Sequence, residues 1–119
     1  MSEHQRRHPL AAPADPGASG TAVIFDSAAN PRADGHRSKD RVRVVCYLDV
    51  ADAELKVEWA ESSTGTLRSF STETITANTV FERDILLLPG RTKVYIATTT
   101  DPGNWQVAAE LIDGHELSQ

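Results

Sequence analysis

Few residues of this chain stand at spacings that support chemistry. Histidine occurs at positions 4, 8, 36 and 115, each within a tail or a polar loop. His4 and His8 are four residues apart, and that spacing brings two metal ligands together only on a helix. No helical periodicity surrounds them, so we expect solvated histidines rather than a metal site.

Acidic side chains form three pairs whose spacing suits acid–base chemistry or a calcium site built from oxygen ligands. Each pair lies on or beside a segment that alternates like a strand. A half-buried strand needs a charged face toward solvent, and that simpler interpretation is the one we favour. The pairs are Glu54 with Glu58, Asp49 with Asp52, and Glu82 with Asp84.

The sequence contains no zinc-protease, phosphate-loop or nucleophile-elbow motif. Its one cysteine, Cys46, lies on the apolar face of an alternating segment, which favours a small buried side chain over a nucleophile. A single cysteine also allows no internal disulfide. We therefore expect a non-enzymatic protein with no cofactor and no metal.

The stretch TTTDPGNWQV, residues 98–107, places Trp105 directly behind a turn signal. It is either a binding loop with an aromatic platform or a hairpin turn followed by a core tryptophan. Pro102 presets the first turn dihedral and Gly103 supplies a positive one. Trp105 also shares its phase with Val107, so we favour the turn. A binding loop would use Thr98–Thr100, Asp101 and Asn104.

The elements that must position these residues are strands. Apolar and polar residues alternate with a period of two, and no window shows the spacing of a helix. Six or seven such segments with short, turn-rich connections are typical of an antiparallel β-sandwich. The expected strands lie at 21–25, 41–50, 53–61, 66–76, 78–90, 91–100 and 104–112. We expect a short strand and polar loop over 21–40, the sandwich over 41–113, and a polar tail over 114–119.

The run ILLLP contains four consecutive apolar residues, Ile85, Leu86, Leu87 and Leu88. Such a run on a strand places apolar side chains on both faces. One face enters the core, and the other meets either a covering loop or another subunit. Both alternatives remain open, and we take these four residues as partner-binding candidates. The expected core also contains Leu55, Val57, Trp59, Val94, Ile96, Trp105 and Leu111.

Residues 1–20 are rich in Ala, Pro, Gly and Ser. Such a segment buries too little apolar surface to offset its ordering entropy, so alone it should be disordered. We expect an extended arm that contacts a partner through Arg6, Arg7 and Leu10. The net charge of the whole chain is −5, which argues against binding to nucleic acid. No segment reaches membrane-spanning length, and no signal peptide is recognised.

The stretches VCYLDVADAELKVEWAESSTGTLRSF and ITANTVFERDILLLPGRTKVYIATTTDPGNWQVAAELI resemble small virion proteins of tailed bacteriophages. The resemblance covers residues 41–112 and is a layout of strands and turns. It implies a jelly-roll or galactose-binding-like sandwich. An aromatic residue beside the Ser-Thr-Gly turn, found in carbohydrate-reading relatives, is missing here. The matching positions are Tyr47-Leu48-Asp49, Leu55 to Trp59, Ala77-Asn78, Arg91 to Ile96 and Trp105 to Leu111.

This resemblance implies a structural protein of a phage virion, made in the host cytoplasm, which attaches to and stabilises the capsid or another part of the particle. Its partner would be the major capsid protein or another virion protein. Several copies or a homo-oligomer are expected, without nucleic acid or membrane. The alternative is a carbohydrate- or receptor-binding module of a virion.

Overall fold

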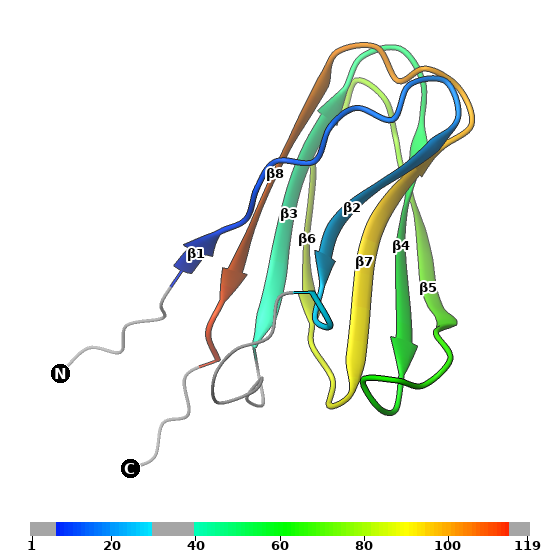
Figure 1. Cartoon of the computed structure of the whole chain (residues 1–119). Coiled ribbons are helices and arrows are strands. Elements are labelled where there is room, and N and C mark those ends of the chain that lie inside the picture. Colours follow the sequence, from blue (N-terminus) through cyan, green and yellow to red (C-terminus); the bar gives the residue numbers. More distant parts are fainter. Residues whose placement is uncertain (1–6, 30–39, 115–119) are drawn as a thin grey trace, which may run out of the picture.

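The computed structural model describes residues 7–29 and 40–114, which form eight strands and no helix. Two four-stranded sheets pack face to face (Figure 1). No helix that could span a membrane occurs in these residues. The strands are β1 (Arg7–Pro9), β2 (Gly20–Asp26), β3 (Arg41–Leu48), β4 (Ala53–Ala60), β5 (Arg68–Ile75), β6 (Phe81–Leu86), β7 (Arg91–Thr98) and β8 (Trp105–Ile112).

The strand order is that of a jelly roll. One sheet has the order β1-β8-β3-β6 and the other β2-β7-β4-β5. Every pairing is antiparallel, and the first strand pairs with the eighth, the second with the seventh, the third with the sixth and the fourth with the fifth. This wound pairing distinguishes the jelly roll from other sandwiches. The predicted all-β antiparallel sandwich is confirmed, and the strand order selects one of its two expected forms.

The core follows the alternation of the sequence. In β3 and β7 every second residue is buried, and the residues between them face solvent. Most predicted core residues are buried, namely Leu55, Val57, Leu87, Val94, Ile96 and Leu111. The two tryptophans differ from the prediction, because both are only partly buried. Each lies near the end of a strand, where the two sheets no longer cover it completely.

The described part of the N-terminal segment lies along its own sandwich instead of extending away from it. β1 pairs with the outer edge of β8, and Leu10 packs against the core. The indole N–H of Trp105 donates to the carbonyl of Pro13 at 2.8 Å, and the hydroxyl of Thr98 donates to the carbonyl of Gly17 at 2.9 Å. This ordering has no sequence signal, because it depends mainly on backbone groups that almost any residue supplies.

Candidate interaction surface

The two groups of predicted partner-binding residues lie at opposite edges of one sheet. Arg7 is in β1 and Leu10 follows it, whereas Ile85 and Leu86 end β6 at the far edge. Strands β8 and β3 separate them (Figure 1). Arg6 lies outside the described residues. The predicted residues therefore do not form one continuous surface.

The apolar run at the end of β6 divides between the core and the surface. Leu87 is buried, and its N–H donates to the carbonyl of Asp40 at 2.9 Å. Ile85 is partly buried and packs against the core. Leu86 keeps 55% of its surface exposed, so more than half of it has no intramolecular cover. The run thus places Leu87 in the core and leaves Leu86 largely exposed at the surface.

An apolar opening lies between β5 and β6, which are edge strands of different sheets. Phe70 of β5 is 61% exposed beside this opening. Its ring lies 6.5 Å from the ring of Trp59, measured between centroids. Leu86 and Leu88 line the opposite side. We call this surface the β5–β6 opening, and it is the candidate interaction surface. Sequence reasoning missed Phe70, because the Thr-rich segment around it has no clear register.

A charged pair spans the β5–β6 opening. Arg83 of β6 is in phase with the inward-facing Phe81 and Ile85, and its guanidinium binds the carboxylate of Glu73 on β5. The same guanidinium lies 5.0 Å from the centroid of the Phe81 ring. An inward-pointing charge on an edge strand hinders addition of a further strand. The period-two phase of Arg83 could have revealed this placement in the sequence.

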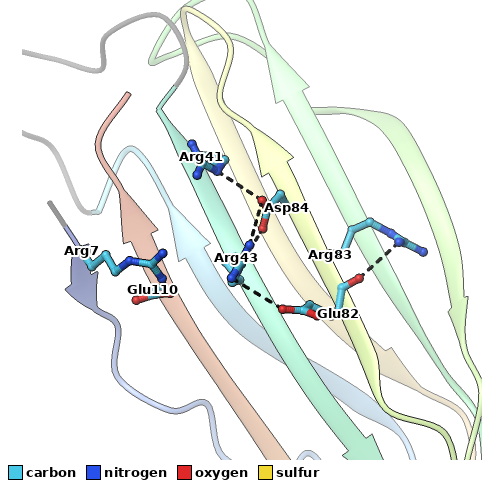
Figure 2. Close-up of polar contacts among 7 residues, drawn as sticks. All are labelled: Arg7, Arg41, Arg43, Glu82, Arg83, Asp84 and Glu110. Atoms are coloured by element: carbon cyan, nitrogen blue, oxygen red, sulfur yellow. Dashed lines mark hydrogen bonds and ion pairs between the residues drawn. The ribbon is translucent and has the colours of Figure 1, made fainter. Parts of the chain in front are cut away.

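The outer face of the β1-β8-β3-β6 sheet is a lattice of alternating charges (Figure 2). Arg43 of β3 donates to Asp84 at 2.9 Å and lies 3.6 Å from Glu82. Arg41 donates to the same Asp84 at 3.2 Å. The Arg43 guanidinium holds the pKa of Asp84 below its usual value. The predicted pair of Glu82 and Asp84 is therefore neutralised by arginines of its own sheet, as a solvent-facing charged surface requires.

The other predicted carboxylate pairs are also engaged within the chain. Glu54 lies 3.6 Å from the ammonium of Lys56, and Glu58 accepts from the hydroxyl of Tyr95 at 2.8 Å. Burial raises the pKa of Tyr95, and this hydrogen bond to Glu58 raises it further. Asp52 accepts from the N–H of Ala77 at 2.8 Å. These contacts favour the interpretation as charged faces and turn supports.

The stretch before Trp105 is a turn, as predicted, but it is not a hairpin, because it crosses from β7 of one sheet to β8 of the other. Gly103 has a positive φ of 85°, as predicted. Asn104 donates to Asp49 from its backbone N–H and from its side-chain amide, each at 2.8 Å. Trp105 packs against the core. Thr98 is buried, and Asp101 accepts from the N–H of Gly103 at 3.0 Å. Most of the polar groups that a binding loop would present are thus bonded within the chain.

The thiol of Cys46 is buried, as predicted, and burial raises its pKa to about 11. His8 lies 3.3 Å from Asp113, whereas His4, His36 and His115 lie outside the described residues. Within residues 7–29 and 40–114, no three His, Cys, Asp or Glu side chains gather as a metal site would require.

No family model and no curated protein matches the chain. In structure it is similar to a chain from the structure of infectious bursal disease virus, Gx strain, with a TM-score of 0.40 and 14% sequence identity. The likeness covers 98% of this chain and 35% of that chain, so this protein spans about a third of the length of its structural neighbour. We base no functional conclusion on a likeness of this level.

Proposed function

We propose that the chain is a non-enzymatic structural protein of a tailed-phage virion, which attaches to the capsid or another part of the particle through the β5–β6 opening. The exposure of Phe70 and Leu86 on opposite sides of this opening carries the proposal. Large apolar side chains grouped at the surface mark a contact with another chain. The jelly-roll fold and the resemblance over residues 41–112 support the virion setting.

The distribution of charge supports a protein partner over nucleic acid. Arg7, Arg41 and Arg43 on the charged sheet face each contact a carboxylate of the same face. A phosphate backbone is bound by arginines and lysines free to replace its counterions. The proposed partner is the major capsid protein or another virion protein, present with several copies of this chain.

The experiment compares three variants for attachment to purified virions of the phage that encodes the chain. Leu86→Ser and Phe70→Ser remove apolar side chains at the β5–β6 opening. Val23→Ser is the matched control, because Val23 is also an exposed apolar side chain, at 47%. It lies on β2, at the edge of the β2-β7-β4-β5 sheet opposite to β5. We expect at least a roughly tenfold loss of affinity for the first two variants and none for the control.

Two results would contradict the proposal. If the chain is missing from purified particles when their density is resolved by cryo-electron microscopy, it is not a virion protein. If it is present but all three variants attach like the wild type, the β5–β6 opening is not the attachment surface. Cooperative thermal unfolding of each variant shows that a loss of attachment does not reflect a loss of fold.

A further inference from the structure

The outer face of the β1-β8-β3-β6 sheet carries charges whose sign alternates from strand to strand (Figure 2). The sign is positive on β1, negative on β8, positive on β3 and negative on β6. From β6 to β1 the order of signs is reversed, so this face is complementary to a second copy of itself. The charged residues, in strand order, are Arg7, then Glu110, then Arg41 and Arg43, then Glu82 and Asp84.

A two-fold axis parallel to the strands, midway between β8 and β3, brings the opposite charges together. Rotation about this axis reverses the strand order, so β3 of one copy lies over β8 of the other, and β1 lies over β6. The rotation leaves each residue at its own level along the strands. Because Arg43 is in register with Glu110, the guanidinium of Arg43 then lies over Glu110 of the second copy. Such an interface is isologous, so this contact occurs twice in the dimer.

Other positions of the axis bring like charges together. An axis across the strands places every strand over its own copy, so the arginines of β3 face arginines and the carboxylates of β6 face carboxylates. An axis parallel to the strands but centred on β3 has the same effect on that strand. Facing like charges oppose association. The chosen axis also keeps the strands of the two sheets nearly aligned, which is a common geometry for stacked sheets.

The same axis brings together the apolar end of the face. Val45 is 37% exposed and Val80 is 69% exposed. Val45 and Ala108 line a shallow hollow above β3 and β8, and Tyr47 and Val80 line a second hollow beside it. Val45 is in register with Ala108, so the larger side chain of each copy lies over the smaller one of the other. Apolar side chains grouped on an exposed surface mark a contact with another chain.

The size of the face suits a weak dimer. Strands β1, β8, β3 and β6 contribute 3, 8, 8 and 6 residues. With strands about 4.8 Å apart and a rise of about 3.4 Å per residue, they cover roughly 400 Å². Side chains add relief to this flat area, so two copies would bury on the order of 1,000 Å² in total, at the lower end of the range for specific interfaces.

We propose that two copies of the chain form a dimer through this outer face, around a two-fold axis parallel to β3 and β8. Every charged strand then faces a strand of the opposite sign, and Val45 of each copy packs on Ala108 of the other. Phe70 belongs to the other sheet, so the dimer leaves it exposed. This inference goes beyond the proposed attachment to a virion and does not depend on it.

The test exchanges charges between the two strands that face each other. Sedimentation equilibrium of the wild type should show dimers with a dissociation constant of about 100 μM or lower. Arg43→Glu brings carboxylates together, and Glu110→Arg brings guanidinium groups together, so each variant alone should dimerise at least about tenfold more weakly. An equimolar mixture of the two variants sets opposite charges against each other at both contacts and should restore association. Misfolding of either variant could not produce this recovery.

A matched pair of bulky substitutions tests the location without a change of charge. Ala108→Trp fills the hollow and should prevent dimerisation. Thr72→Trp should not, because Thr72 is in register with Lys56 on the outer face of the other sheet. Phe70→Ser should also leave the dimer intact, since Phe70 lies at the β5–β6 opening and outside the proposed contact.

A wild type that remains monomeric at about 1 mM overturns the proposal. A mixture that does not associate, although both charge variants unfold cooperatively on heating, overturns it too. Dimers that survive Ala108→Trp, or that Phe70→Ser disrupts, would place the contact on another surface and contradict the proposal as well.

Discussion

At the scale of single residues, two buried threonines on the inner face of β7 form a natural comparison. The hydroxyl of Thr98 donates to the carbonyl of Gly17, whereas that of Thr92 has no partner. Thr92→Val should therefore stabilise the fold, by about 1 kcal/mol or more, and Thr98→Val should destabilise it by a similar amount. Urea denaturation measures both free energies of unfolding. A destabilising Thr92→Val would mean that its hydroxyl is satisfied in solution.

Two glycines with positive φ allow the stability cost of backbone strain to be measured apart from the cost of steric overlap. Gly17 has a φ of 79° and nothing near the position of a Cβ, whereas a Cβ on Gly103 would overlap Asp49 and Val50. Gly17→Ala should cost about 1 kcal/mol of stability. Gly103→Ala should cost on the order of 3 kcal/mol, because the turn between β7 and β8 must also move. Equal thermal stabilities of the two variants would contradict this explanation.

The pair of Asp26 and Arg91 sets an acid limit on stability. Arg91 binds both carboxylate oxygens of Asp26, at 3.0 and 2.7 Å, and this contact lowers the pKa of Asp26 below its usual 3.8. A lowered folded-state pKa stabilises the fold above the unfolded value, and this contribution disappears as the pH falls through the folded value. Asp26→Asn should therefore lose stability near pH 7 and approach the wild type at low pH.

The measurement for this pair is urea denaturation of both proteins from pH 7 down to pH 2. Asp84→Asn is the control, since the side chain of Asp84 is 37% exposed against 14% for Asp26. Solvent screening should make the loss at neutral pH smaller for this control. A constant difference between Asp26→Asn and the wild type across the whole pH range would rule out the titration of Asp26 as the cause.

At the scale of elements, β1 determines whether β8 is an edge strand. Removing residues 1–10 would delete β1 and Leu10 and leave the backbone of β8 unpaired on one side. Exposed edges pair with other chains, so this truncation should lower stability and promote self-association. Analytical ultracentrifugation measures the association. Removing residues 1–6 is the control, because it leaves every described contact of β1 in place; equal behaviour of both truncations would contradict the role of β1.

The strand predictions were correct wherever apolar and polar side chains alternate in the sequence. Period two was sufficient for β3, β4, β7 and β8 and for the burial of Cys46, because the apolar face of a strand determines which side enters the core. β1 was missed because its pairing requires only backbone groups. The alternation in the sequence gives the inward phase of Arg83. It does not give the partner Glu73, since the two residues meet only when the sheets pack.

Sequence reasoning could not predict the β5–β6 opening either. Its volume depends on how far β5 and β6 stand apart and on the rotamers of Trp59 and Phe70, and neither follows from periodicity. The same limit explains why Trp59 and Trp105 were predicted as full core residues. The alternation gives the face on which a side chain lies, but not how completely the opposite sheet covers it.

At the scale of the whole molecule, the jelly-roll order joins strands that are far apart in sequence. β1 pairs with β8, and β2 pairs with β7, so these ladders close only when most of the chain has been gathered. Proteins dominated by such distant pairings fold in milliseconds to seconds. Stopped-flow refolding followed by tryptophan fluorescence should give a rate in that range. Folding within microseconds would show that local contacts, rather than the wound topology, determine the barrier.

The buried thiol of Cys46 also makes the chain convenient for labelling. A thiol-reactive dye requires an accessible thiolate, and this cysteine is fully buried with its pKa raised to about 11. The natural sequence therefore behaves toward such reagents as if it contained no cysteine. A single cysteine introduced at an exposed position such as Val23 would be the only site to take up dye, so, under the proposed virion role, the fluorescence of purified particles would count the copies that each one carries.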